Sequence, residues 1–473
     1  MRIIIVGAGL VGTQLSRSLI EEKHDVSLIE SQAERARYAS NRLDCLVIHD
    51  EGNSQSALAE AGIAKADALV CVTGSDEVNM LICGLAASQY PGILKIARVR
   101  NDEYIRLNRS RDRLLGIDHF VHPDVEAARY ALNAIEHGAL GDILAFAGTA
   151  YQLGSIDIAP ESLLDGLPLT RFHTLIKGES LVTLLERQGE SILPEGATVL
   201  RQGDRIHVLA KEKELKELFT CAGRSGSSLR KIGIVGGGRL GMLIAEGLLA
   251  PATGKSSPVF SFLRRFMPKS LRRVVIIEQD YGLCKDLAAR FPEALVLNED
   301  ISDESFVAEE RITDLDLIVT ATGHQELNII TAVYLKSRGV RRAVALVTGA
   351  GYGTIARQLG VDVVIPMKSV VVDSIRSHLM GGAVKGIHRI GDGSVGVIEL
   401  EIEKASPLAN KPITEFRLSG GGLVLLVNRA GDSFIPKGDY CFRVADRVIL
   451  ITPAVGAIYR GKSASGFNTP GWP

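Results

Sequence analysis

Short apolar runs alternate along the chain with stretches of helical periodicity. Residues 2–6 form an apolar run that ends in three closely spaced glycines. Behind the glycines, Leu10, Leu15 and Leu19 recur at helical spacing, so this stretch predicts a strand, a tight turn and a helix. A second apolar strand at 26–30 ends in an acidic residue. The chain therefore opens with a strand–helix–strand unit.

The same alternation continues for about 138 residues. Further strands are expected at 45–49, 68–72, 94–99 and 115–121, with helices between them. Pro123 suits the first position of the next helix. Strands that alternate with helices at this interval predict a parallel, doubly wound sheet with right-handed crossovers. The expected fold class is α/β, and the first domain is Rossmann-like.

The glycines have the spacing G-x-G-x-x-G, at Gly7, Gly9 and Gly12. Between a strand and a helix, the first glycine permits the turn, the second lets the backbone approach a pyrophosphate, and the third allows close packing. The helix N-terminus also offers N–H groups to an anion. Glu30 follows Gly7 by 23 residues, about where a ribose-binding carboxylate belongs. We predict a nucleotide site here; a glycine turn that only packs is the alternative. Its residues are Gly7, Ala8, Gly9, Leu10, Val11, Gly12 and Glu30.

The whole signature returns after residue 230. Residues 231–241 repeat the strand, the glycines and the start of a helix, and the strand at 274–278 again ends in an acid. The candidate site residues of this second copy are Gly236, Gly238, Arg239, Leu240, Gly241 and Glu278. The chain therefore contains two tandem copies of one nucleotide-binding unit.

A small module follows each copy. From about 139 to 222 the periodicity falls toward two, and turn-forming residues separate short strands, which indicates a small α+β module. A similar pattern closes the second half of the chain. The predicted domains are 1–138, 139–222, 229–385 and 386–460, with a flexible linker at 223–229 and a disordered tail at 461–473.

The second copy has an insertion at about 250–270. Its basic residues and phenylalanines suit contact with a membrane or an acidic partner, and a solvated surface loop is the alternative.

Loops after the other strands of the first copy supply further candidates, because ligands bind outside the carboxyl ends of parallel strands. These candidates are Arg35, Asp50, Thr73, Gly74, Arg98 and Arg100. We expect Asp50 to contact the edge of the nucleotide base. Arg98 and Arg100 would reach phosphates, and the alternative for both is a surface ion pair. The choice of an acid at Glu30 favours NAD, or another unphosphorylated adenosine ribose, over NADP.

The two sites are predicted to be unequal. Leu346 and Thr348 stand where the first copy has Arg98 and Arg100, while Arg239 lies inside the second glycine loop. The second site should therefore hold a nucleotide through different phosphate contacts.

Composition limits the function classes. The 473 residues include 54 basic and 55 acidic side chains, so the charge balance gives no reason to expect a nucleic-acid partner. No apolar run approaches the ~20 residues of a membrane-spanning helix, so no membrane span is expected. The N-terminal residues do not have the pattern of a signal peptide, so secretion is not expected. Six scattered cysteines without ligand spacing predict no structural metal. The expected protein is soluble and cytoplasmic.

Catalytic groups are not evident in the sequence. A hydride-transfer enzyme needs a proton-handling side chain beside the nicotinamide, usually from a sizeable second domain, and each copy is followed only by a small module. The sequence therefore favours regulatory nucleotide binding without catalysis. An NAD-dependent oxidoreductase is the alternative, and a scaffold with vestigial sites is a third reading.

With these motifs in place, the chain resembles the peripheral Trk-type potassium-uptake proteins over about residues 1–460. The resemblance rests on the first glycine loop, on Thr73-Gly-Ser-Asp-Glu-Val-Asn79, on Ile96-Ala-Arg-Val-Arg-Asn101 and on a Leu-Pro-x-Gly to Gly-Asp-Arg-Ile pattern that ends at Ile206. Its modules are similar to domains that regulate potassium conductance. The resemblance implies a cytosolic homo-oligomer, a tetrameric ring, at the inner face of the cell membrane. It also implies a separate membrane potassium-translocating subunit as partner, gated by NAD(H) and ATP or ADP.

Overall fold

We analysed a computed structural model of the 473-residue chain. It describes residues 1–452 apart from 105–106, 108–112, 137–138, 140–142, 147, 161, 176–177, 189, 223–228, 250–272, 381–383, 391–394, 405, 407 and 417–421. The predicted basic insertion, almost all of the predicted linker and the predicted tail lie outside this range. Among the described helices, none combines the length and the apolar character that crossing a membrane requires.

The first Rossmann-like sheet has six parallel strands in the order β3-β2-β1-β4-β5-β6. These strands are β1 (Arg2–Val6), β2 (Asp25–Glu30), β3 (Leu46–His49), β4 (Ala68–Cys71), β5 (Leu94–Arg98) and β6 (His119–Val121). The helices between them are α1 (Leu10–Glu21), α2 (Ala33–Ser40), α3 (Gln55–Glu60) and α4 (Asp76–Gln89). The strand order reverses at β1 and β4, and the cleft for a ligand in such sheets lies at the carboxyl ends of the strands at this reversal.

The second sheet repeats this order as β14-β13-β12-β15-β16-β17, also in parallel. Its strands are β12 (Lys231–Val235), β13 (Arg273–Glu278), β14 (Leu295–Asn298), β15 (Leu317–Thr320), β16 (Arg342–Val347) and β17 (Val363–Pro366). Its helices are α8 (Arg239–Leu249), α9 (Tyr281–Arg290), α10 (Glu304–Glu309), α11 (Gln325–Ser337) and α12 (Ala350–Gln358). The predicted duplication of the nucleotide-binding fold is confirmed.

The two copies exchange their last helices. Helix α6 (Pro123–Glu136) follows the first sheet in sequence, yet its buried face shares a hydrophobic core with β12, β13 and α8 of the second. Helix α13 (Met367–Met380) follows the second sheet, and its residues from Val371 on pack into the core around β1, β2 and α1 of the first. The contacts accordingly divide the chain into one unit of residues 1–123 with 371–473 and another of residues 124–370.

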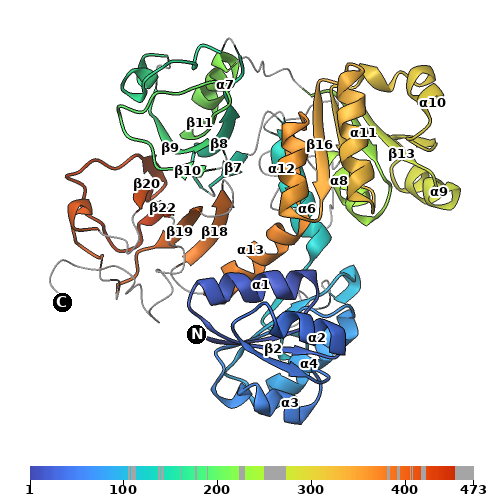
Figure 1. Ribbon diagram of the computed structural model, residues 1–473, viewed down its shortest axis with the longest axis vertical. Helices are drawn as coiled ribbons and strands as arrows, with labels where there is room; N and C mark the ends of the chain where they lie inside the picture. The colour runs from blue at the N-terminus through green and yellow to red at the C-terminus, as the bar shows by residue number, and fades with distance from the viewer. Residues whose placement is uncertain are drawn as a thin grey trace. The chain divides into compact units, whose positions relative to one another are not determined.

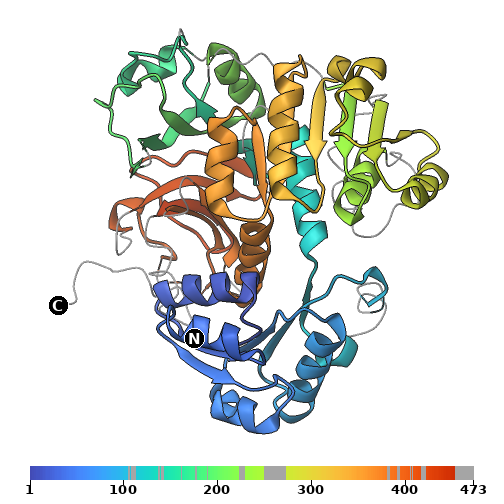
Figure 2. The ribbon, with the colours of Figure 1, turned by 45° about the vertical axis from the view of Figure 1, so that its right-hand side comes forward.

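Both exchanged helices are closely fitted. A Cβ added at Gly247 of α8 would come within 2.3 Å of the Leu132 side chain of α6, so this glycine permits the close approach of the two helices. On α13, the fully buried Arg376 forms an ion pair with Glu22, which directly follows α1. Helix α13 lies across α1 in both ribbon views (Figure 1 and Figure 2).

The small modules are two five-stranded antiparallel sheets with the same topology, β10-β9-β11-β8-β7 and β18-β19-β22-β20-β21. The first contains β7 (Ile143–Ala145), β8 (Tyr151–Asp157), β9 (Ser180–Arg187), β10 (Glu190–Ile192), β11 (Arg205–Lys211) and α7 (Glu212–Cys221). The second contains β18 (Val384–Ile390), β19 (Val395–Glu401), β20 (Leu423–Arg429), β21 (Asp432–Phe434) and β22 (Arg447–Thr452). Short 3₁₀ turns lie at Ile63–Lys65, Leu114–Gly116, Leu169–Thr174, Ile312–Asp314 and Ile413–Glu415.

An arginine–aspartate fork recurs in both small modules. Arg187 donates to both oxygens of the buried Asp204 at 2.8 and 2.6 Å. Arg429 makes the same two bonds to Asp446 at 2.8 and 2.9 Å. The fork lowers the pKa of Asp446 against the opposing effect of burial. The aspartate of the Gly-Asp-Arg-Ile pattern is therefore structural, and the predicted α+β character of the modules is confirmed. The domain limits drawn from the sequence stay predictions.

Candidate functional site

The first glycine loop has the geometry of an anion-binding turn. Gly7 has a φ of 105°, which side chains other than glycine rarely adopt. A Cβ at Gly12 would come within 1.8 Å of the Gly7 carbonyl oxygen, so α1 could not begin this close to β1 with any larger residue. At Gly9, the N-cap of α1, an added Cβ would meet nothing within 4 Å. The loop therefore leaves open space directly before the helix N-terminus.

The second loop repeats each of these features. Gly236 has a φ of 97°, and a Cβ at Gly241 would lie 1.9 Å from the Gly236 carbonyl oxygen. At Gly238 the Cβ position is again open. Both loops therefore offer the same backbone shape to a ligand.

An acid at the end of the second strand holds each loop in place. Glu30 accepts a hydrogen bond from the Ala8 N–H at 2.6 Å and one from the Gln32 N–H at 2.9 Å. Glu278 accepts from the Gly237 N–H at 2.7 Å and from the Asp280 N–H at 2.9 Å. Each carboxylate oxygen can accept further bonds, so these contacts leave capacity for ribose hydroxyls. The two acids lie beside their loops, as expected; their role toward a ligand stays a prediction.

A buried asparagine organises the loop after β4. Asn79 accepts from the N–H and the hydroxyl of Thr73 at 2.8 and 2.7 Å. Its amide donates to the carbonyl oxygens of Thr73 at 3.3 Å and Arg98 at 2.9 Å. The network joins the ends of β4 and β5 at the reversal of strand order. The role of Asn79 was not predicted from the sequence.

The same network is present in the second copy. Asn328 accepts from the N–H and the hydroxyl of Thr322 at 2.9 and 2.7 Å, and it donates to the Leu346 carbonyl oxygen at 3.1 Å. The recurrence of Thr-Gly followed five residues later by Asn, at 73–79 and at 322–328, was the signal that could have identified it.

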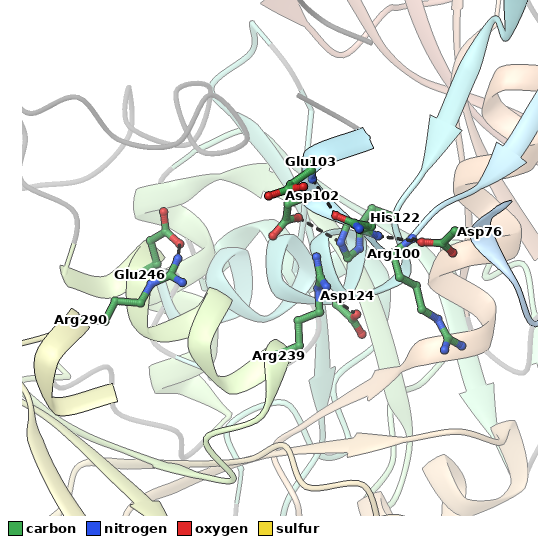
Figure 3. A network of polar contacts seen from close by, with 10 residues as sticks. Asp76, Arg100, Asp102, Glu103, His122, Asp124, Arg239, Glu246 and Arg290 are labelled. Carbon is green, nitrogen blue, oxygen red and sulfur yellow. Dashed lines mark hydrogen bonds and ion pairs between the residues drawn. The ribbon is translucent and has the colours of Figure 1, made fainter. Parts of the chain in front are cut away.

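Arg98 and Arg100 occupy different environments. Arg98 is buried, and its guanidinium donates to the Thr73 carbonyl oxygen at 2.6 Å, so it supports the loop from behind. Arg100 is exposed, and its backbone N–H donates to Asp76 at 2.7 Å (Figure 3). The surface ion pair considered as the alternative also stays open. Their contact with phosphates stays a prediction.

The remaining candidates of the first copy lie on surrounding loops. Asp50 accepts from the Glu51 N–H at 2.7 Å and the Ser54 hydroxyl at 2.9 Å, which places it in the turn that begins α3. Arg35 is exposed on α2. A Cβ at Gly74 would meet nothing within 4 Å, so the loop after β4 is also open. Val11 lies in the first turn of α1, and Leu10 is largely exposed there.

The second loop differs from the first in its charge. Arg239 is the first residue of α8, and its Nε lies 3.7 Å from an oxygen of Asp124 on α6 (Figure 3). Leu240 is buried behind it. Cys284 donates through its thiol to the Glu278 carbonyl oxygen at 3.3 Å, and burial raises its pKa, which keeps the thiol protonated. Among the described residues no cluster of histidine, cysteine and acids could hold a metal ion.

These observations define a class of protein. Two doubly wound sheets, each with a preformed anion-binding loop and a following small module, make a tandem Rossmann-like protein with two candidate nucleotide sites. Sequence comparison adds two domain families: the TrkA-N domain matches residues 3–123 and 259–366, and the TrkA-C domain matches residues 397–458. The two together account for more than half of the chain.

Full-length relatives agree with this assignment. The Trk system potassium uptake protein TrkA of Azorhizobium caulinodans is 26% identical over 459 residues, which is 96% of each chain. The protein of the same name from Haemophilus influenzae is 26% identical over 95% of each chain. A solved structure described as "GsuK channel bound to NAD" has the same fold, with a TM-score of 0.56 and 18% identity over 95% of this chain and 76% of its own.

The chain belongs to the TrkA family of Trk-system potassium uptake proteins. It is a regulatory protein of potassium uptake and not an enzyme, as predicted from the sequence. The oxidoreductase alternative is therefore set aside.

Proposed function

We propose that this protein binds NAD(H) and ATP or ADP at two unequal sites, one at each glycine loop. One observation carries the proposal: both loops are held open by an acid, with the Ala8 N–H at 2.6 Å from Glu30 and the Gly237 N–H at 2.7 Å from Glu278. A loop already fixed in its binding shape loses little conformational entropy when a pyrophosphate arrives. The NAD bound to a channel protein of the same fold supports this choice of ligand.

The bound nucleotide regulates a separate membrane subunit that translocates potassium. The family of Trk-system uptake proteins supports this partner. In this view the protein is cytoplasmic and lies at the inner face of the membrane through its partner. A ligand shifts such an equilibrium only by its differential affinity for the two states. We expect NADH and ATP or ADP to favour different arrangements of the ring. We expect a coupling of about 1–3 kcal/mol between nucleotide and gate.

The protein acts as a homo-oligomer, for which we propose a tetrameric ring. Helix α4 supports this with three exposed apolar residues one turn apart, Val78, Leu81 and Leu85, whose exposed fractions are 40, 51 and 40%. Apolar side chains that line one helix face in this way suit a protein interface. Burial against another copy would remove them from water.

Two substitutions test nucleotide binding without disturbing the fold. Gly9→Asp places a carboxylate in the open space of the first loop, where its Cβ meets no atom within 4 Å. Aspartate is a favoured N-cap residue, so α1 should be at least as stable as before. The negative charge should repel a pyrophosphate and abolish binding at the first site alone. Gly238→Asp is the matched variant of the second site, where the Cβ position is also open.

Calorimetric titration of NADH, ATP and ADP into the wild type and both variants measures the number and the affinity of the nucleotide sites. We expect two sites of different affinity, each removed by its own substitution. Nucleotide binding that survives in a double Gly9→Asp, Gly238→Asp variant would refute the assignment to these loops.

Potassium or rubidium flux through the co-reconstituted membrane subunit tests the regulation. Flux that ignores every nucleotide, or that persists unchanged without this protein, would refute gating.

A further inference from the structure

The second loop is faced by a carboxylate from another helix. Arg239 is the residue after Gly238, and its Nε lies 3.7 Å from Asp124 Oδ2 (Figure 3). The Arg239 side chain is 39% exposed and that of Asp124 is 20% exposed, so the pair is accessible to a ligand. An ion pair in this position puts a negative charge where an incoming phosphate would also seek a partner.

Asp124 is held there by the packing of α6 on α8. The two helices share one core, and the Leu132 side chain occupies the notch left by Gly247. Helix α8 has no acidic residue in its own first turn. An anion at a helix N-terminus is stabilised by the helix dipole, so Asp124 supplies from α6 a charge that α8 itself lacks.

We propose that Asp124 is an internal competitor of the nucleotide phosphate at the second site. The inference rests on the proposed function and adds its regulation: a phosphate that binds before α8 takes over Arg239 from Asp124. The open Cβ position of Gly238 leaves room for the phosphate beside Arg239. Two negative groups do not share one exposed guanidinium without mutual repulsion, so the phosphate and Asp124 exchange.

This device belongs to the second site alone. The first loop has Leu10 at the position of Arg239, and the residue after Pro366 that corresponds to Asp124 is Met367. The apolar residues Leu10 and Met367 thus correspond to the charged residues Arg239 and Asp124. The first site binds its nucleotide without internal competition, while the second responds only when the ligand carries enough phosphate charge to displace Asp124.

The replacement of Asp124 by a phosphate at Arg239 changes the contacts at the start of α6. Asp124 is the first residue of its structural unit, directly after Pro123, which ends the first segment of the other unit. Besides Arg239, the charged groups near it on α6 are Glu126 and Arg129, which pair with each other at 3.0 Å. Once Arg239 has turned to a phosphate, Asp124 no longer ties the first turn of α6 to α8. Ligand at the second site thereby loosens the point where the chain passes between the units.

The test uses the full chain with the first site removed by Gly9→Asp and ADP as the probe. In this background, Asp124→Asn should raise the affinity for ADP about two- to fivefold, the range for a half-exposed ion pair. The control is Glu246→Gln, which removes a different carboxylate from α8, one that pairs with Arg290 at 3.0 Å. The control should leave the affinity unchanged. With Arg239→Gln already present, Asp124→Asn should give no gain.

Hydrogen exchange provides the second readout. In the Gly9→Asp protein, ADP should speed exchange of the amides of residues 127–129, whose helical hydrogen bonds go to the first turn of α6. In the Asp124→Asn variant these amides should exchange fast with or without ADP. If ADP binds equally well or more weakly after Asp124→Asn, or if the α6 amides ignore ADP, the competition is refuted while nucleotide binding stands. If the Gly9→Asp protein binds no ADP, both this inference and the proposed second site are refuted.

Discussion

Replacing Asn79 by alanine should destabilise the first nucleotide-binding unit strongly. The side chain is fully buried and makes four hydrogen bonds, to Thr73 after β4 and to Arg98 at the end of β5. Two of its partners would have another bond after the change: the Thr73 carbonyl oxygen still accepts from Arg98, and the Thr73 hydroxyl can give its one proton to the Ser75 carbonyl oxygen. The Thr73 N–H and the Arg98 carbonyl oxygen would lose their Asn79 partner.

The magnitude follows from these two groups. A buried polar group that loses its partner costs about 1–3 kcal/mol, so two of them should cost about 2–6 kcal/mol. A chain with several domains does not unfold in one step, and a global midpoint would mix the units. Native-state hydrogen exchange of the β4 and β5 amides instead reports the opening free energy of this region. We expect that free energy to fall by about 3 kcal/mol, within the range above.

Two variants make the comparison specific. Ser88→Ala removes an exposed hydroxyl from the same helix, one that donates to the Leu85 carbonyl oxygen at 2.8 Å, and should change stability by less than about 0.5 kcal/mol. Asn328→Ala breaks the equivalent network and should produce a similar loss in β15 and β16. If Asn79→Ala costs no more than Ser88→Ala, the network does not stabilise the loop and our reasoning is wrong.

Three further predictions concern other features. Gly12→Ala brings a Cβ to 1.8 Å from a carbonyl oxygen and should abolish calorimetric nucleotide binding at the first site, whereas Gly92→Ala, with no atom within 4 Å, should bind normally. Leu81→Glu combined with Leu85→Glu should lower the oligomeric mass in light scattering; an unchanged mass would exclude α4 from the interface. Burial, the charged amino terminus and Arg376 lower the pKa of His24 to about 4. Because the unfolded chain then binds the extra proton, stability should fall as pH drops from about 6.5 to about 4. His24→Gln should flatten acid unfolding curves in that window, and an unchanged slope would contradict the lowered pKa.

The duplicated fold could be predicted because its signals are local. The glycines at 7, 9 and 12 each meet a requirement of the local backbone, and the acid at 30 supplies a charge beside the loop. Their recurrence at 236–241 and 278 indicates a second copy of the same fold. The hydrogen bonds from the loops to Glu30 and Glu278 have the placement that this spacing implies.

The exchange of α6 and α13 could not be predicted in the same way. The apolar face of α6 shows that it packs on a sheet, but both sheets have the same strand order, and no periodicity in the sequence distinguishes them. Asn79 was missed for a related reason. A single polar residue in a helix is predicted to be exposed, and only the hydrogen bonds of Asn79 to Thr73 and Arg98 explain its burial. Choices among equivalent partners depend on tertiary contacts, which the sequence pattern does not encode.

The helix exchange also determines the order in which the protein can fold during synthesis. The core around β1, β2 and α1 contains Val371, Val372, Ile375 and Leu379, which leave the ribosome long after residue 123. Until then the nascent first sheet exposes the apolar surface that α13 will cover, and exposed surface of this kind promotes aggregation. The contacts that complete it span more than 350 residues of chain, as the pair of Glu22 and Arg376 illustrates. A half-length product of translation would therefore be an incomplete domain, in need of a chaperone or of a second chain that donates the missing helix.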